Sequence, residues 1–186
     1  VSGNSSWFFG GIENNGGTLH LINSTFSDNT ASAWGGGIGN QKGATLTLVN
    51  STISGNSASD GGVIENNRSS TVTLTNSTVS GNSASRGGGI NNRSGLSAWD
   101  PDQASALTLV NSTVTHNSTS DAGGIRNQSS NPVNFKNTII AGNSAVSTGP
   151  DCDGTLTSQD FNLVQNVSGC TITGSTNNNN IIGQDP

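Results

Sequence analysis

The side chains that could carry out chemistry are few: this chain of 186 residues contains 11 Asp and Glu, six Lys and Arg, and two His. Glu13 and Glu65 are the strongest catalytic candidates, because each follows the isoleucine of a similar five-residue segment. If those two segments stack with one further segment between them, their carboxyl groups lie about 9–10 Å apart. That separation is near the upper limit for an inverting glycosidase. Gly39 falls between them, however, and no set of Lys, Arg or His accompanies them, so we expect a non-enzymatic protein.

A second candidate site is an insertion between Asn92 and Leu107, where one repeat is longer than the others. It contains Trp99, Asp100 and Asp102. The indole could stack on a sugar ring while the carboxylates accept hydrogen bonds from its hydroxyl groups. We therefore treat the insertion as a candidate carbohydrate-binding loop, and the alternative is a solvated loop without a function of its own.

The other reactive residue types do not form a site in the sequence. Lys42 and Lys136 are isolated, which leaves the chemistry of polysaccharide lyases unsupported, and His20 and His116 fall in different columns of the repeat. Asp151 opens an Asp-x-Asp-Gly segment that is similar to the start of a calcium loop, but the later ligands are missing. We therefore expect neither a metal nor another cofactor.

Composition excludes several classes of protein. The net charge of -5 argues against a nucleic-acid-binding protein of the usual basic kind. A membrane-spanning helix needs about 20 consecutive apolar residues, and the sequence has no such run. The chain begins at Val1 and contains no methionine, so we expect a processed product or a piece of a longer protein.

The elements that must position the candidate residues are short repeats. More than half of the residues are Asn, Gly, Ser or Thr, and only 29% are hydrophobic, but the hydrophobic residues recur at regular spacing. Three kinds of segment alternate along the chain. Segments of the NST type start at 23, 50, 76, 111 and 137, segments of the GGI type at 10, 36, 62, 88 and 123, and strand-like segments of the TLTL type at 18, 45, 71, 106 and 132.

These segments predict an all-β solenoid with three short strands in each coil of about 26 residues. Stacking places successive coils about 4.8 Å apart. The alternation of side chains along a strand directs one apolar column from each segment type into a narrow core. Two such columns are Phe26, Ile53, Val79, Val114 and Ile140, and Ile12, Ile38, Ile64, Ile90 and Ile125.

Asparagines recur at three fixed positions, and we expect each set to form a ladder in which every amide donates to one neighbouring coil and accepts from the other. The ladders are structural, and each bond contributes on the order of 1 kcal/mol. Asn also tolerates the left-handed conformation of a tight corner. The glycines before each isoleucine are expected to allow positive φ and close approach of the coils. The three sets are Asn23, Asn50, Asn76, Asn111 and Asn137; Asn29, Asn56, Asn82, Asn117 and Asn143; and Asn14, Asn40, Asn66, Asn92 and Asn127.

Hydroxyl side chains are predicted to point outward in regular rows. One face carries Thr25, Thr52, Thr78 and Thr113 beside Ser27, Ser54, Ser80 and Thr115. A second face carries Thr45, Thr47, Thr71, Thr73 and Thr108, interrupted by His20 and Asn134. Regular Thr rows on a rigid solenoid resemble the ice-binding faces of antifreeze proteins. The alternative is that Thr simply suits an exposed strand position.

One further column precedes the isoleucines and holds Phe8, Trp34, Asp60, Arg86 and Asp121. We expect Phe8 and Trp34 to stack, and the three charged residues to form an alternating ladder. An acid–base cluster is the functional interpretation. Exposed ion pairs, each worth about 0–1 kcal/mol, are the interpretation that we prefer.

Cys152 and Cys170 are the two cysteines of the chain, so a single intramolecular disulfide is available. A disulfide suits an oxidising compartment such as the cell exterior. The alternative is a pair of free thiols in a reducing compartment.

The paired GG-x-I and Phe26-x-x-Asn29 patterns resemble the repeats of chlamydial polymorphic outer membrane proteins. The chain is also similar to bacterial β-helix proteins with choice-of-anchor Q domains, through the segments 137–143, 149–152 and 168–170 and the C-terminal Gly-x-Asp-Pro at 183–186. Both resemblances imply a right-handed parallel β-helix in a secreted or surface protein. Neither implies a particular activity.

The sequence therefore predicts a five-coil β-helix over residues 1–146 and a C-terminal coil with a capping segment over 147–186. We expect an extracellular or bacterial cell-surface protein with a structural or adhesive role. Glycans, other surface proteins or further copies stacked end to end are its expected partners. Ice binding through the Thr and Ser rows, and carbohydrate binding or cleavage, are the alternatives.

Overall fold

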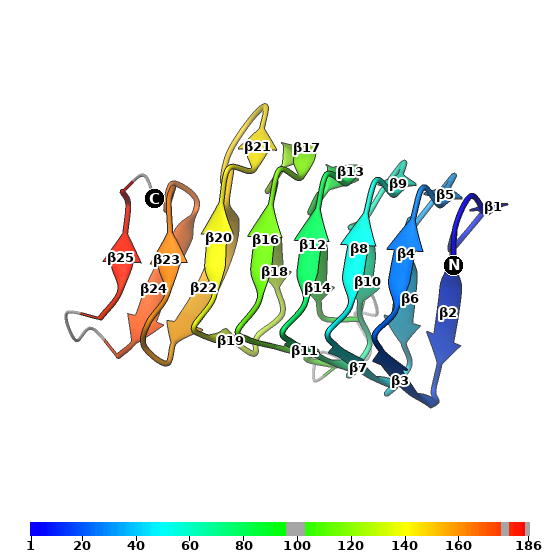
Figure 1. Cartoon of the computed structure of the whole chain (residues 1–186), viewed down its shortest axis with the longest axis horizontal. Helices are drawn as coiled ribbons and strands as arrows, with labels where there is room; N and C mark the ends of the chain where they lie inside the picture. The colour runs from blue at the N-terminus through cyan, green and yellow to red at the C-terminus, as the bar shows by residue number, and fades with distance from the viewer. Residues whose placement is uncertain (96–102, 176–178, 185–186) are drawn as a thin grey trace.

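The computed structural model describes residues 1–95, 103–175 and 179–184, and over these ranges it forms a right-handed parallel β-helix without any helix. Successive coils lie side by side, from the N-terminus at one end of the molecule to the C-terminus at the other (Figure 1). Every strand pair is parallel and joins neighbouring coils. The predicted fold class is confirmed.

The strands form four stacks, which we call A to D. Stack A contains the NST segments: β4 (Thr25–Ser27), β8 (Thr52–Ser54), β12 (Thr78–Ser80), β16 (Thr113–Thr115), β20 (Ile139–Ala141), β23 (Leu163–Val164) and β25 (Ile181–Ile182). Stack B contains β1 (Ser5–Ser6), β5 (Thr30–Ala31), β9 (Ser57–Ala58), β13 (Ser83–Arg86), β17 (Ser118–Asp121) and β21 (Ser144–Ala145). Stack B was not expected, because its strands are short and carry almost no large apolar residue.

Stacks C and D are joined into one sheet, because β22 runs through both. Stack C contains the GGI segments: β2 (Ile12–Asn15), β6 (Ile38–Gln41), β10 (Ile64–Asn66), β14 (Ile90–Arg93), β18 (Ile125–Gln128) and the first part of β22 (Cys152–Ser158). Stack D contains the TLTL segments: β3 (Thr18–Ile22), β7 (Thr45–Val49), β11 (Thr71–Thr75), β15 (Ala106–Val110), β19 (Val133–Lys136), the rest of β22, and β24 (Cys170–Gly174).

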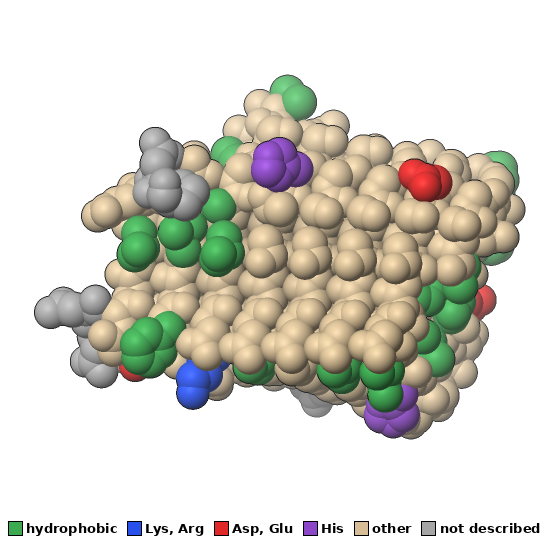
Figure 2. Space-filling model, viewed as in Figure 1, with side chains coloured by type: hydrophobic (Ala, Val, Ile, Leu, Met, Phe, Trp, Pro, Cys, Tyr) green, Lys and Arg blue, Asp and Glu red, His purple; other side chains and the backbone are tan. Residues whose placement is uncertain are grey.

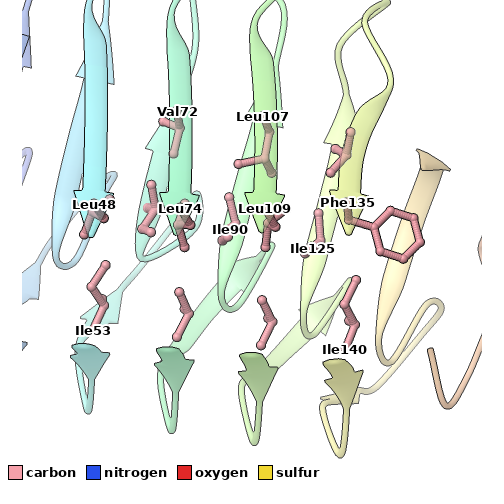
Figure 3. Close-up of a cluster of buried hydrophobic side chains, with 14 of the residues drawn as sticks. Leu48, Ile53, Val72, Leu74, Ile90, Leu107, Leu109, Ile125, Phe135 and Ile140 are labelled. Carbon is pink, nitrogen blue, oxygen red and sulfur yellow. The ribbon is translucent and has the colours of Figure 1, made fainter. Parts of the chain in front are cut away.

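The core is a narrow column filled from stacks A, C and D, and Figure 3 shows these side chains converging on the interior. In β7, Leu46 and Leu48 are fully buried while Thr45 and Thr47 are half-buried on the outer face. The predicted column headed by Phe26 is buried throughout, and so is the isoleucine column apart from Ile12, which is half-buried. One-residue-deep packing explains how a low apolar content is sufficient to form a core.

The glycines before the isoleucines have one of the two roles expected of them, the close approach of the coils. Gly10 and Gly123 do not adopt positive φ; an added Cβ would lie 2.2 Å from the Gly36 carbonyl oxygen and 2.4 Å from that of Pro150, respectively. Positive φ occurs one residue earlier, for example at Gly35. The pairs are therefore required for close approach of the coils, and the expectation of positive φ at these positions was wrong.

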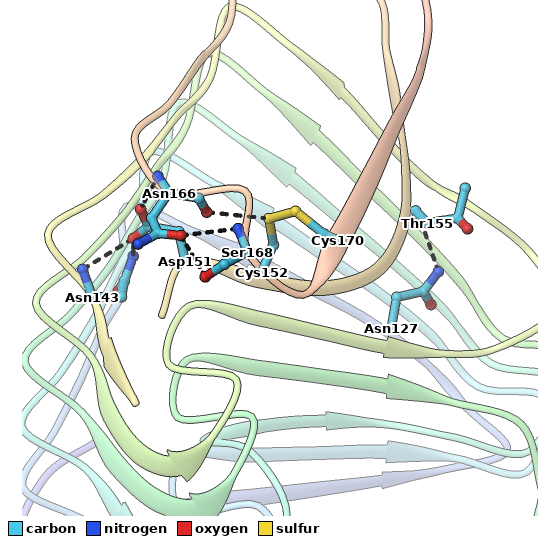
Figure 4. The surroundings of a disulfide bond; sticks show 8 residues. All are labelled: Asn127, Asn143, Asp151, Cys152, Thr155, Asn166, Ser168 and Cys170. Carbon is cyan, nitrogen blue, oxygen red and sulfur yellow. Dashed lines mark hydrogen bonds between the residues drawn. A yellow bond between two sulfur atoms is a disulfide. The ribbon is translucent and has the colours of Figure 1, made fainter. Parts of the chain in front are cut away.

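The ladder that begins at Asn29 is buried and nearly continuous. Each side chain donates from Nδ2 to Oδ1 of the next coil at 2.9–3.1 Å, and that same oxygen also accepts from a backbone N–H. The ladder ends on Asp151, whose Oδ1 accepts from the Asn143 side chain at 2.8 Å (Figure 4). Because these groups are buried, each missing bond would leave an unpaired polar atom.

The other two ladders are also present. In stack C, the amides from Asn14 to Asn127 are joined by bonds of 2.7–3.0 Å. The corner ladder that begins at Asn23 has φ between 49° and 51° at every member, as the tight turn requires. Its side chains from Asn50 to Asn137 are linked at 2.9–3.1 Å but remain exposed.

The C-terminal segment continues the solenoid. β24 pairs with β22, and β25 pairs with β23. Cys152 and Cys170 form the expected disulfide, with a Cα–Cα distance of 5.5 Å (Figure 4). The bond therefore ties β24 to the preceding coil.

Candidate functional site

The outer face of stack A is a flat array of hydroxyl groups. Thr25, Thr52, Thr78 and Thr113 are neighbours in register, and the serine column beside them continues to Thr115. Most of these side chains are half-buried against their neighbours along the stack, and Thr25 is exposed. Figure 2 shows them as even rows almost without charge. The predicted rows therefore exist as a geometric array.

The array changes character toward the C-terminal coils. Ile139 takes the position of Thr113 in the next coil, and Leu163 and Ile181 follow it in register. Ile139 is 44% exposed and Ile181 is 47% exposed, and Phe161 lies in the same hollow. The hydroxyl face is therefore bordered by an apolar patch, visible as hydrophobic side chains that interrupt the rows in Figure 2.

The second Thr face lies on stack D. Thr45 pairs with Thr71, and Thr47 with Thr73, so the expected columns are present. His20 and Asn134 interrupt them at the two ends, as predicted. This face is therefore less uniform than the one on stack A.

The Glu13 and Glu65 column has the predicted register, with Gly39 between the two glutamates. Glu65 is fully buried: its Oε1 atom accepts from Arg93 Nε, and its Oε2 atom accepts from Asn91 Nδ2 at 2.8 Å. Such a carboxylate is closed to a substrate and serves as a counter-ion. The structure therefore gives no support to a glycosidase pair.

Sequence reasoning missed a column of polar residues beside Glu13 and Glu65, which includes the cation Arg93. This column of stack C contains Gln41, Asn67 and Arg93, each of which lies three residues after the isoleucine of its segment. Extending the repeat alignment by one residue past Asn40, Asn66 and Asn92 would have found it.

A groove of about 210 Å³ lies beside the Glu13 column. Its lining includes Glu13, Gln41 and two cations, Lys42 and Arg68, which we call the rim cations. Gln41 links two of them: Nε2 donates to Glu13 Oε1 at 2.6 Å, and Oε1 accepts from Arg68 Nη1 at 3.4 Å. The groove is therefore lined by an ordered row of polar groups.

Aromatic side chains form the wall of the groove. Phe9 packs directly over Gly39, where an added Cβ would lie 2.2 Å from the Phe9 ring, so the missing side chain makes room for it. Phe8 and Trp34 have ring centroids 5.9 Å apart at a tilt of 39°, which confirms the expected contact. The Arg93 guanidinium lies 5.8 Å from the Trp34 centroid, within range of a cation–π interaction.

A small cavity of about 10 Å³ adjoins the groove and shares Trp34, Gln41 and Arg68 with it. Asn67 lines this cavity and is 95% buried, since its exposed fraction is 5%. Its Oδ1 atom has no hydrogen-bond partner in the structure, while Nδ2 donates to Glu65. The cavity has about the volume that one donor group, such as a water or a hydroxyl, would fill.

The expected charge ladder is only partly formed. Arg86 Nη1 lies 3.4 Å from Asp60 Oδ1, as predicted. Asp121 is the register neighbour of Arg86 but pairs with Arg126, at 3.3 Å. Burial raises the pKa of Asp153, the coil neighbour of Arg126, and the nearby Asp121 carboxylate adds to that rise.

The insertion that contains Trp99, Asp100 and Asp102 lies outside the described residues, so the predicted carbohydrate-binding loop stays a prediction.

Asp151, at the start of the segment similar to a calcium loop, makes contacts within the protein. It is buried, and its oxygens accept from Asn143 and from the backbone N–H of Asn166. No group of three metal-binding side chains occurs within the described ranges, and no helix there is long and apolar enough to cross a membrane.

Comparison with known proteins gives one match. Residues 23–41 match the model of the Chlamydia polymorphic membrane protein repeat. No curated protein and no solved structure matches the chain. The matched segment runs from the first NST strand to the second GGI strand, β4 to β6, so one repeat of this β-helix is similar to a repeat of chlamydial membrane proteins. That similarity suggests a surface-associated β-helix.

Proposed function

We propose that this chain is a non-enzymatic adhesion module of an extracellular or surface protein, and that its contact surface is the hydroxyl face of stack A. The observation that carries the proposal is the registered array of Thr and Ser on a rigid sheet. A hydroxyl both donates and accepts hydrogen bonds, so the array complements a flat, uncharged and polyhydroxylated surface. Packed neutral glycan chains have these properties.

The array has the geometry that repeated weak contacts require. Coils are about 4.8 Å apart, and alternate residues along a strand are about 6.6–6.8 Å apart. Individual contacts are weak, but many sites held on one rigid body bind together with greater avidity. The match to a chlamydial membrane protein repeat supports the surface setting.

The test is binding to neutral glycans on an array and to insoluble neutral polysaccharides, with product release followed by mass spectrometry. Thr78→Lys places a charge in the centre of the array. Thr73→Lys is the matched control, because Thr73 is half-buried on the same coil but belongs to stack D. We expect binding without cleavage, at least tenfold weaker for Thr78→Lys and unchanged for Thr73→Lys. Absence of neutral-glycan binding, or equal loss in both variants, contradicts the proposal.

Ice binding is the second candidate function, and the two-dimensional regularity of the same rows favours it. An ice-binding face holds ordered water. Evenly spaced hydroxyl and methyl groups of Thr can order water in this way. Thermal hysteresis of the purified chain would support this candidate, provided that it falls in Thr52→Lys or Thr78→Lys and persists in Thr73→Lys. A chain without hysteresis removes it.

A further inference from the structure

The groove on stack C lies on a different face from the hydroxyl array, so its function can be considered independently. Gln41 lies between an anion and a cation, since it bonds to Glu13 on one side and to Arg68 on the other, and Lys42 also lines the groove. We propose that this groove binds an acidic saccharide, with the sugar carboxylate at Arg68 and Lys42 and a neighbouring sugar ring along the aromatic wall.

The two rim cations are available to a ligand. The ion pairs of the described residues involve Arg86, Arg93 and Arg126 but neither Arg68 nor Lys42. Arg68 donates to the neutral Gln41 side chain, and Lys42 is exposed. A guanidinium can bind a carboxylate through two parallel hydrogen bonds. Arg68 therefore has donor capacity left for a carboxylate.

The aromatic wall provides the apolar part of the site. Phe8 is 51% exposed and lines the groove together with Phe9 and Trp34. Phe9 is held in place by its packing on Gly39, and Trp34 by its contacts with Phe8 and Arg93. The C–H face of a pyranose ring is apolar and fits such a wall, whereas a small inorganic anion would leave the wall unused.

Two acceptors select for hydroxyl groups. Glu13 presents an exposed carboxylate that Gln41 separates from Arg68, and Asn67, which lines the adjoining cavity, has an Oδ1 atom without a partner. Glu13 can accept from a sugar hydroxyl directly, and the buried Asn67 Oδ1 atom can do so through one water in the cavity. The groove therefore complements a ligand that combines a carboxylate with hydroxyl groups.

Long-range charge does not account for binding of this kind. The net charge of the chain is -5, which repels acidic ligands in general. An acidic saccharide must therefore be retained by the local groups of the groove, and removing one local cation should have a large effect. Removing a cation elsewhere should have little effect.

The experiment is titration calorimetry at low salt with oligosaccharides of galacturonic, glucuronic and sialic acid, and with the methyl ester of each. We expect the wild-type chain to bind at least one acid and not its ester. Arg68→Ala should weaken binding at least tenfold. Arg86→Ala, the matched control on stack B, should change it less than twofold, and so should Thr78→Lys on the hydroxyl face.

Several outcomes would overturn the proposal. These are no binding of any acid, equal binding of acid and ester, or equal loss in Arg68→Ala and Arg86→Ala. If Arg68→Ala does not fold, as judged by circular dichroism, Lys42→Ala replaces it with Lys136→Ala as its control, since both lysines are exposed. Because Thr78→Lys tests the other face, failure here is distinct from failure of the adhesion proposal.

Discussion

On the outer face of stack A, most coils place a Thr or Ser at the same position, whereas on stack C the outward column changes from coil to coil. Thr52 and Thr78 are interchangeable members of a row. Glu65 and its register neighbour Asn91 are not interchangeable, because Glu65 accepts hydrogen bonds from Arg93 and Asn91, whereas Asn91 donates one to Glu65. A repeated face draws its properties from the array. A varied face draws them from individual contacts, so single substitutions should affect the two faces very differently.

The largest effect is expected at the buried ion pair of stack C. Arg93→Ala leaves the fully buried Glu65 without its cation and should lower the free energy of unfolding by about 3–5 kcal/mol. Chemical denaturation monitored by circular dichroism measures it. Arg93→Met with Glu65→Leu removes both charges and should be more stable than Arg93→Ala. A single variant as stable as the wild type would show that the pair is not needed.

The next largest effect is expected where Phe9 packs on Gly39. Gly39→Ala places a methyl group into the Phe9 ring and should cost about 1–3 kcal/mol. Adding Phe9→Ala removes the clash, so the cost of the double variant should be clearly less than the sum of the two single costs. Strict additivity in thermal unfolding would mean that the two residues do not interact.

The smallest mutational effect is expected on the hydroxyl face. Thr78→Ala removes one member of a row and should change the free energy of unfolding by no more than about 0.5 kcal/mol. The same denaturation experiment applies. A loss comparable with that of Arg93→Ala would abolish the distinction between the two faces.

A pH-dependent effect is expected at Asp153, also on stack C. Its pKa is raised in the folded chain above the ordinary value of 3.8, so the folded state holds a proton that the unfolded state has released. Wild-type stability should therefore fall as the pH rises from 3.8 through the raised pKa. Asp153→Asn lacks this loss, so it should be more stable than the wild type at pH 7 and equally stable at pH 3. A constant difference at all pH values contradicts this assignment.

The fold was predictable because its cause is the repeat itself. Apolar residues and asparagines at fixed offsets define which side chains are stacked, and the columns of Phe26 and Asn29 follow directly. Stack B was not predicted, although short Ser-Ala or similar segments recur after each Asn of the Asn29 ladder, because they carry almost no large apolar residue that would mark a strand facing the core. Positive φ was assigned to the wrong glycines, because sequence cannot distinguish a glycine needed for conformation from one needed for space.

The candidate site was only half predictable. The column of Glu13 and Glu65 came from the alignment, but their environment did not. Arg93 follows the aligned segment, and Arg68 lies in a turn of variable sequence, so neither was assigned to a column. The burial of Glu65 depends on residues from neighbouring coils that are distant in the sequence, such as Asn91.

The central claim is that the two faces bind different ligands independently. The most direct test measures neutral-glycan and acidic-saccharide binding on one array for the wild type, Thr78→Lys and Arg68→Ala. We predict that Thr78→Lys loses neutral-glycan binding and keeps acidic-saccharide binding, and that Arg68→Ala does the reverse. Loss of both activities in either folded variant, or of neither, would contradict the account.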